Sequence, residues 1–288
     1  MARFSRLAPL SHFVEYKLAV ALVNFFSPLE NKKNHELLGI PIQQGKIIPL
    51  STFDFISYID KKINPSLTNF LFTTLEIESA HAIKDRILDL IKRLVAANIL
   101  THSGTKQAYN ECYHTLKEYT TQEQKGVIWL TPVLGFSFLL DYLQPYIVQI
   151  TGKNIKGDTH CGTGILISNS LILTCAHVIS DMEVDNEQIL NGKTVQVIEQ
   201  NYHSKIDVGY LKVDNSNFRD IGLCFNNPRN MMDIAIAGYP KIPYSRASSL
   251  LLQKGEINGF IQGLDGNNYF LFSAIARPGN SGGANFLG

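Results

Sequence analysis

Apolar residues recur with two different periods along the chain, and the period changes near residue 145. In the first half they follow the helical pattern. It is clearest over 82–97, where apolar positions three and four apart alternate with Lys, Arg and Asp. Start signals predict two further helices: Ser51 is followed three residues later by Asp54, and Thr131 is followed by Pro132. The first half is therefore predicted to be mainly helical.

Beyond residue 146 the apolar runs are shorter, richer in β-branched residues and separated by Gly and Asn. These runs predict strands at 147–151, 162–168, 171–174, 194–198, 208–213, 232–238, 250–259 and 269–275. Many short strands at such spacing are typical of a β-sandwich or β-barrel. The chain is thus predicted to be a multidomain α + β protein, with a helical domain at 1–145 and a β domain at 146–288. Its length of 288 residues suits two domains of roughly 150 residues each.

Composition narrows the range of partners. The 26 Lys and Arg residues nearly balance 25 Asp and Glu, so no global field attracts nucleic acid or an anionic membrane. The longest apolar tract, 127–140, is shorter than the roughly 20 residues that span a bilayer, and it is predicted to be a buried helix. Charges interrupt 13–26, which favours an amphipathic helix over a signal peptide. We therefore expect neither a membrane nor a nucleic-acid partner.

The cysteines are too few for a disulfide scaffold, and none forms a C-x-x-C pair. They are Cys112, Cys161, Cys175 and Cys224. The pairs His160-Cys161 and Cys175 with His177 fit no familiar zinc spacing, and metal coordination would occupy a histidine that the chemistry below requires. We expect no metal and no cofactor.

Three segments of the second half carry the residue types needed for acyl transfer. A strand ending in small residues presents His177, Asp207 opens an alternating strand, and Ser281 lies in a glycine-rich turn. A serine hydroxyl becomes nucleophilic when an imidazole takes its proton and a carboxylate orients that imidazole. In the same turn, the backbone N–H groups of Gly279 and Ser281 can stabilise the oxyanion. We interpret His177, Asp207 and Ser281 as a candidate catalytic triad.

Other acids compete with Asp207 for the carboxylate role. The rivals are Asp181, Asp185 and Asp214. Only Asp207 opens an apolar alternating strand, where we expect its carboxylate to be buried beside the imidazole.

The order and surroundings of these residues resemble the trypsin-like (chymotrypsin-fold) serine proteases, with spacing closest to the HtrA-like bacterial branch. The run Gly162-Thr163-Gly164-Ile165-Leu166-Ile167 is similar to the strand before the family's catalytic histidine. Gly238-Tyr239-Pro240 is similar to a turn early in the second barrel. The resemblance implies a double β-barrel, an acyl-enzyme mechanism and a protein or peptide substrate.

Three departures from the family pattern qualify what the resemblance implies. Val178 stands where secreted relatives carry the disulfide partner of a cysteine at Cys161, which implies a reduced thiol and a cytoplasmic location, with a periplasmic or secreted one as the alternative. Asn280 replaces the aspartate that trypsin pairs with its new N-terminus, so activation needs another trigger. The chain ends at Gly288, where the family's second barrel needs further strands. We expect the natural chain to continue, or another chain to supply them.

Specificity is predicted from one further position of the family pattern. The residue six before the nucleophile commonly lies at the base of the primary pocket, and here it is Ile275. An apolar base cannot neutralise a buried Lys or Arg. We expect cleavage after small or medium apolar residues.

The first half matches no family in its entirety, but 66–125 has the outline of a winged helix: a helix, a short extended run, a polar turn and a second run. It shows no Lys/Arg cluster for phosphate contacts. We expect a sensor or docking module through which an activating partner acts, as in architectures of bacterial stress and defence systems. The leading function is a regulated serine endopeptidase. The alternatives are a catalytically silent protease-fold binding protein and a DNA-binding regulator.

Overall fold

The computed structural model describes residues 9–42, 46–106, 110–116, 118–120, 123, 126, 128–214, 223, 225, 227–246 and 248–287. Their contacts divide the chain into two compact units. The first comprises 1–120 and 132–135, and the second comprises 121–131 and 136–288. The sequence predicts the domain boundary near 145, whereas the contacts divide the chain between residues 120 and 136.

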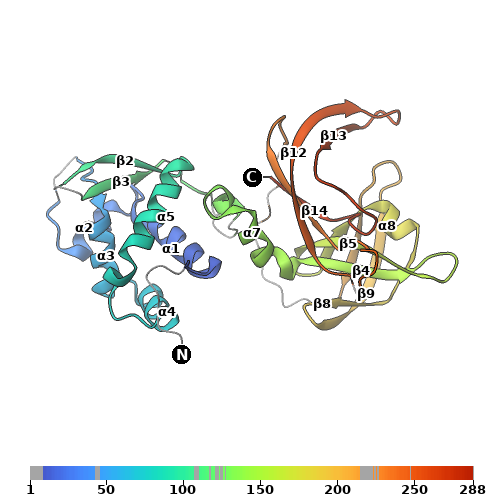
Figure 1. Ribbon diagram of the computed structural model, residues 1–288, viewed down its shortest axis with the longest axis horizontal. Coiled ribbons are helices and arrows are strands. Elements are labelled where there is room, and N and C mark those ends of the chain that lie inside the picture. The colour runs from blue at the N-terminus through green and yellow to red at the C-terminus, as the bar shows by residue number, and fades with distance from the viewer. Residues whose placement is uncertain are drawn as a thin grey trace. The chain divides into compact units, whose positions relative to one another are not determined.

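The first unit is mainly helical, as its apolar periodicity predicts (Figure 1). Its helices are α1 (His12–Phe25), α2 (Asn31–Leu38), α3 (Thr52–Asp60), α4 (Pro65–Leu75) and α5 (Lys84–Ala96), with the 3₁₀ turn η1 (Ala80–Ile83) before α5. The strands β1 (Leu50–Ser51), β2 (Leu100–Thr105) and β3 (Glu111–Thr115) form an antiparallel sheet in the order β1-β3-β2. The hairpin after α5 follows the winged-helix outline, whereas β1 comes from upstream of the predicted range 66–125. Part of that range lies outside the described residues.

An aromatic cluster fills the core of this unit. Edge-on contacts join Phe25 to Phe55 and Tyr58, and join Phe26 to Tyr113 on β3. Such pairs stabilise a core beyond the burial of their area. The helices α1, α3 and the hairpin are therefore held by one cluster.

The second unit consists of two curled antiparallel sheets (Figure 1). The larger has the order β7-β4-β5-β6-β10-β9-β8, and the smaller has the order β13-β12-β11-β14. The larger sheet contains β4 (Ile147–Lys153), β5 (Thr159–Ser168), β6 (Leu171–Thr174), β7 (Glu183–Val184), β8 (Glu187–Leu190), β9 (Lys193–Tyr202) and β10 (Gly209–Val213). The smaller contains β11 (Asp233–Gly238), β12 (Leu251–Gln262), β13 (Asn268–Phe272) and β14 (Ala284–Leu287). A helical region followed by a trypsin-like β fold is the fold class that the sequence predicts.

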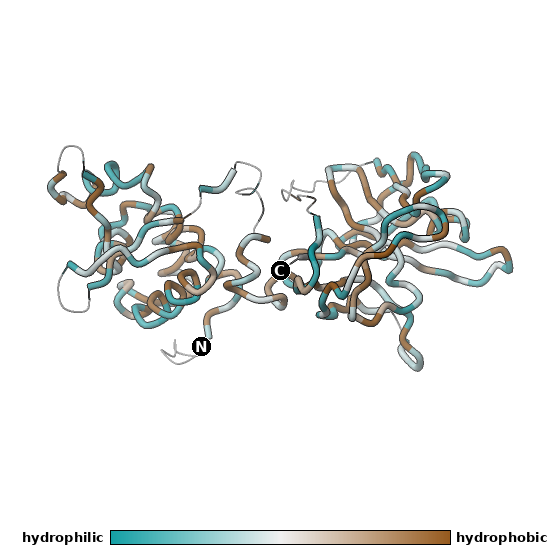
Figure 2. Tube along the Cα trace, turned by 90° about the horizontal axis from the view of Figure 1, so that it is seen from above, coloured by the Kyte–Doolittle hydropathy of each residue, from teal (hydrophilic) through white to brown (hydrophobic). Residues whose placement is uncertain are grey.

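Each sheet encloses its own apolar core. Ile150, Leu166, Ile172 and Leu211 belong to the core of the larger sheet. The smaller sheet buries Ile234, Ile236, Ile257 and Ala274. Figure 2 shows apolar and polar residues interspersed along this unit. Burial alternates along β8 and β10, as expected for a sheet with one covered face.

Helix α7 (Thr131–Leu143) departs from its predicted start and from a single straight axis. The sequence predicts that Thr131 caps it, but the 3₁₀ turn η2 (Ile128–Leu130) runs directly into the helix, and the Thr131 hydroxyl donates to the Ile128 carbonyl at 2.5 Å. Gly135, with φ 79° and ψ 171°, breaks the helix.

None of the described helices is long and apolar enough to cross a bilayer.

Asp54 joins helix α3 to the hairpin of the first unit. Its carboxylate accepts hydrogen bonds from the Ser51 N–H at 2.7 Å and from Lys106 at 2.8 Å, while the Ser51 hydroxyl caps the helix in return. Burial alone would raise the pKa of Asp54, but the hydrogen bonds from Lys106 and Ser51 and the Lys106 charge outweigh it and lower that pKa. The carboxylate is therefore more stable charged in the folded unit than in the unfolded chain.

We expect Asp54→Asn to lower the free energy of unfolding by about 1–2 kcal/mol at neutral pH, because it removes a cap partner and an ion pair. The folded-state pKa lies below the unfolded value of about 3.9, so the stabilisation is present above pH about 4 and is lost as pH falls through the folded-state pKa. Urea unfolding of both forms between pH 7 and 3 measures this. The control Asp85→Asn, at an exposed position in the first turn of α5, should change less. A difference independent of pH would contradict the assignment.

Candidate active site

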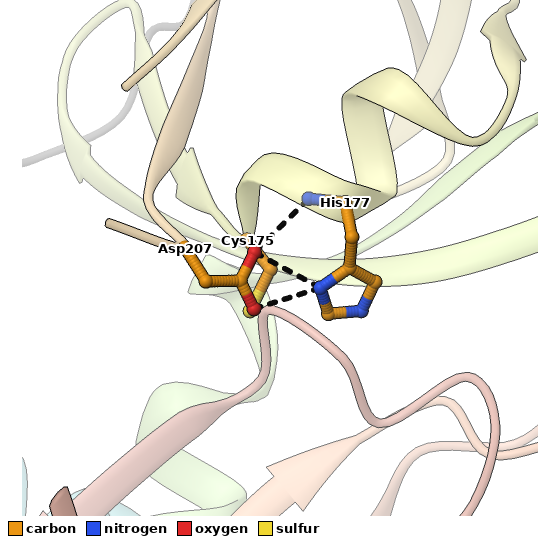
Figure 3. A group of neighbouring side chains, drawn as sticks. All are labelled: Cys175, His177 and Asp207. Atoms are coloured by element: carbon orange, nitrogen blue, oxygen red, sulfur yellow. Dashed lines mark hydrogen bonds and ion pairs between the residues drawn. The ribbon is translucent and has the colours of Figure 1, made fainter. Parts of the chain in front are cut away.

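His177 and Asp207 meet where two paired strands end. His177 lies in the short helix α8 (Ala176–Ser180), directly after β6, and Asp207 lies on the loop before β10. Strands β6 and β10 pair antiparallel, with Thr174 opposite Gly209, so the two loops emerge side by side. The His177 Nδ1 lies 2.7 Å from Asp207 Oδ2, and the His177 backbone N–H donates to Asp207 Oδ1 at 3.0 Å (Figure 3). Because Nδ1 faces the carboxylate, Nε2 is the ring nitrogen left for a nucleophile.

The Asp207 carboxylate is less buried than the sequence predicts, and it stays ionised. The Asp207 side chain is 52% exposed and the His177 side chain 44% exposed, because Asp207 lies on the loop ahead of β10. Burial alone would raise the pKa of Asp207. The hydrogen bonds from the His177 backbone and ring, the His177 charge and the Cys175 thiol outweigh burial and hold that pKa below its ordinary value. Asp207 can therefore orient and stabilise a protonated His177.

Cys175 lies beside this pair and links it to the loop 279–283, which contains Ser281 and is called the serine loop below. Burial raises the pKa of the Cys175 thiol to about 11, with a further contribution from the Asp207 charge, and a hydrogen bond from the Gly282 N–H acts in the opposite direction. A thiol with so high a pKa keeps its proton and can donate to Asp207. Cys175 is thus a neutral neighbour of the pair, and its thiol is not activated as a nucleophile.

The loop 279–283 lies so close to neighbouring backbone that only glycine fits at three positions. A Cβ on Gly282, which has φ 79°, would lie 2.1 Å from the Thr163 carbonyl oxygen. One on Gly283 would lie 2.3 Å from the Ala237 oxygen, and one on Gly279, with φ 98°, would lie 2.5 Å from the Tyr239 oxygen. Close approach therefore requires all three glycines, and the backbone angles of Gly279 and Gly282 favour glycine as well.

Backbone N–H groups in this loop fall into two sets. The Asn280 N–H donates to the Arg277 carbonyl, and the Gly283 N–H donates to the Asn280 carbonyl. The N–H groups of Gly279 and Ser281, by contrast, have no acceptor within the part of the chain that the structure describes. These two residues are the ones that the sequence predicts as oxyanion donors.

The remaining two predicted site residues are less constrained. Among the described residues, the Ser281 hydroxyl makes no hydrogen bond to His177 or to another group. Hydrogen bonds of this kind are often long before substrate binds. Ile275 is 61% exposed. Its assignment as a pocket residue stays a prediction.

Metal ligation has one candidate set of residues in the described chain. One donor atom from each of Cys175, His177 and Asp207 lies within 4.8 Å of the others. Hydrogen bonds within the same group already account for this proximity, and the Cys175 thiol retains its proton. His160 and Cys161 belong to no such group among the described residues. Cys112, Cys161 and Cys175 are free thiols.

A second Ser, His and Asp grouping lies in the first unit and has a different connectivity. The Ser79 hydroxyl and the His81 Nδ1 each lie 3.0 Å from the Asp60 carboxylate. The Ser79 hydroxyl also contacts Nδ1 of His81, the same nitrogen that contacts Asp60, and not Nε2. Asp60 also accepts from the Ala80 N–H, and Ser79 accepts from the His81 N–H. This arrangement caps η1 and offers no relay from serine through histidine to aspartate.

Comparison with known proteins shows that part of the second unit is similar to a known domain family. Residues 162–287 match the family model of the trypsin-like peptidase domain. The match contains His177, Asp207 and Ser281, and the family resemblance predicted from the sequence is confirmed for this segment. No curated protein matches the chain.

Several solved protease structures are similar to part of this chain. The active form of the Rv3671c protease from M. tuberculosis is 21% identical, covering 51% of this chain and 67% of that one, with a TM-score of 0.41. The HtrA-type protease AlgW with a tripeptide is 18% identical, covering 51% and 48%, with a TM-score of 0.39. A serine endoprotease from Yersinia pestis is 22% identical, covering 59% and 54%, with a TM-score of 0.40. The chain spans about half the length of the last two.

We expect Gly282→Ala to destabilise the second unit far more than Gly266→Ala. Both glycines have φ 79°, so both substitutions incur the left-handed backbone cost of about 1–2 kcal/mol. Only at Gly282 does the new methyl group meet neighbouring atoms, whereas Gly266 has open space. The extra overpacking should cost about 1–3 kcal/mol, measured by urea unfolding. Equal losses in the two variants would show that the loop does not pack as described.

Proposed function

We propose that the trypsin-like peptidase domain at 162–287 is a serine endopeptidase that cleaves protein substrates through an acyl-enzyme intermediate. The observation that carries the proposal is the His177–Asp207 pair beside a loop whose Gly279 and Ser281 N–H groups are free. A binding protein without turnover would have no need of free donors beside an oriented imidazole. This supports the enzyme over a silent protease-fold protein.

Each residue of the site has a role in the proposed reaction. The Ser281 oxygen attacks the substrate carbonyl carbon while its proton passes to Nε2 of His177, and Asp207 stabilises the imidazolium through Nδ1–H. The N–H groups of Gly279 and Ser281 stabilise the oxyanion. The intermediate expels the amine, which takes the proton from His177. Water then attacks the acyl group by the same route, releasing the acid and restoring the Ser281 hydroxyl.

The first unit is proposed to sense or dock a partner that regulates this reaction. Several of its basic side chains are engaged internally: Arg93 pairs with Glu15 at 2.5 Å, Lys106 pairs with Asp54, and Lys84 lies over the Phe53 ring. The Arg93 and Lys84 contacts disfavour a phosphate-binding surface on α5, so docking is preferred to DNA binding. The free thiols of the chain fit a reducing, cytoplasmic compartment.

A fluorophosphonate probe tests the reaction directly. The full chain should label, Ser281→Ala should abolish labelling, and His177→Ala should slow it by about three orders of magnitude or more, because triad members act as a unit. Ser180→Ala, which changes an exposed serine on α8, should label like the wild type. If the folded wild-type chain does not label, or if Ser281→Ala labels equally, the enzyme proposal fails and the silent binding protein replaces it.

The proposed specificity is cleavage after small or medium apolar residues, because the run that leads from β13 to Ile275 is mostly apolar. In peptide-library profiling, Ile275→Asp should raise cleavage after Arg or Lys about fivefold, the effect of an ion pair of roughly 1 kcal/mol. Leu271→Asp, at an exposed position on β13, is the matched control and should leave the profile unchanged. Strict cleavage after Arg or Lys by the wild type would contradict the specificity.

A further inference from the structure

Thr163 occupies a buried position between the serine loop and two neighbouring segments. It lies on β5 with no exposed surface, and its hydroxyl donates to the Gly279 carbonyl at 2.6 Å and accepts from the Tyr239 N–H at 2.9 Å. Its backbone N–H donates to the Ser281 carbonyl at 2.8 Å. Thr163 thus holds the carbonyl groups of both residues that are proposed to supply oxyanion donors.

The sequence around Thr163 explains why its side chain faces the loop. Side chains of a strand alternate between its faces, so Gly162 and Gly164 face away from Thr163. A Cβ on Gly162 would lie 2.6 Å from Val178, and one on Gly164 would lie 2.5 Å from Ile172. The two glycines let β5 lie close to the core of the larger sheet, and the opposite face presents the threonine to Gly279.

Peptide planarity converts held carbonyl groups into oriented N–H groups. The plane from Gly279 to Asn280 is fixed at its oxygen by Thr163 and at its N–H by Arg277. The adjacent planes, which contain the two free N–H groups, are fixed by the Lys241 N–H on the Pro278 oxygen and by the Gly283 N–H on the Asn280 oxygen. The two planes that contain the free N–H groups are held by backbone groups alone. The plane between them is held by the Arg277 carbonyl and by the Thr163 hydroxyl.

The side chain of residue 280 does not provide this support through its oxygen. Asn280 is uncharged, and its Oδ1 is buried and accepts no hydrogen bond from the described residues. No ionic anchor can therefore form at this position. The Thr163 hydroxyl is the side-chain group that holds the Gly279 carbonyl.

We propose that Thr163 is a positioning residue, whose hydroxyl keeps the loop 279–281 in the conformation that presents the Gly279 and Ser281 N–H groups to the oxyanion. This inference rests on the proposed function. The inference deepens that function, because it assigns the support of the oxyanion site to a neutral hydroxyl on β5. The support is built into the fold of the peptidase domain.

The test compares Thr163→Val, which keeps the shape and removes the hydroxyl, with Thr163→Ser, which keeps the hydroxyl. In the full chain we expect Thr163→Val to lower kcat about 10- to 100-fold with KM changed less than about twofold, because loss of one oxyanion donor costs about 10²–10³ in kcat. The affinity for a peptide boronate should fall in parallel with kcat. Thr163→Ser should stay within about threefold of the wild type in both measurements.

A matched control removes a hydroxyl elsewhere in the same sheet. Thr151 lies on β4 and donates to Asp185 at 2.8 Å, so Thr151→Val should leave kcat and boronate affinity unchanged. If Thr163→Val does not fold, Thr163→Ala removes the same hydroxyl without a bulkier replacement and should show the same loss of kcat. Failure of both to fold would indicate a purely structural role and overturn the proposal.

Two further results separate this inference from the proposed function. A folded wild-type chain that no fluorophosphonate labels overturns the function and the inference together. A wild type that labels on Ser281, with Thr163→Val equal to it in kcat, overturns the inference alone. A Thr163→Ser variant as slow as Thr163→Val would assign the effect to the methyl group and overturn the role of the hydroxyl.

Discussion

Three glycines let the loop at 279–283 lie against the carbonyl groups of β5, β11 and the turn that follows β11, closer than any side chain would permit. The rest of the second unit depends on this approach, because it brings the loop between β13 and β14 of the smaller sheet onto strands of the larger one. Two threonine hydroxyls form hydrogen bonds where the loop meets the larger sheet. The Thr163 hydroxyl donates to the Gly279 carbonyl, and the Thr174 hydroxyl donates to the Thr163 carbonyl at 2.7 Å. The serine loop is thereby fixed next to Cys175, two residues before His177.

The charged half of the site is positioned by a separate feature, the antiparallel pairing of β6 with β10. That pairing places His177 and Asp207 at neighbouring strand ends, and their hydrogen bonds engage Nδ1 of His177 and leave Nε2 for a nucleophile. Because Asp207 stays ionised and Cys175 stays protonated, one group in the cluster carries a negative charge. The two features together assemble an oriented imidazole and free N–H donors from segments far apart in sequence.

Local periodicity was enough to predict the helical first half and most strands of the second, because each depends on nearby residues. The short strands β7 and β8 lie outside the predicted ranges. The chain order of His177, Asp207 and Ser281 was enough to predict the family. Burial of Asp207 was predicted wrongly, since a strand-end pattern does not show that the residue lies on the preceding loop. The prediction that Thr131 caps its helix was wrong, because the 3₁₀ turn η2 runs directly into the helix and the Thr131 hydroxyl donates to the Ile128 carbonyl. The role proposed for Thr163 depends on contacts with residues distant in sequence, and only the glycines flanking it signalled a close approach.

The most direct test of a serine acyl-enzyme is its capture. The full chain is mixed with a p-nitrophenyl ester, quenched in acid and examined by intact mass and by peptide mapping. We predict one acyl group per chain, attached to the peptide that contains Ser281 and absent from Ser281→Ala and His177→Ala. No adduct on the folded chain, or an adduct on Cys175, whose thiol is expected to be unreactive, would contradict the mechanism.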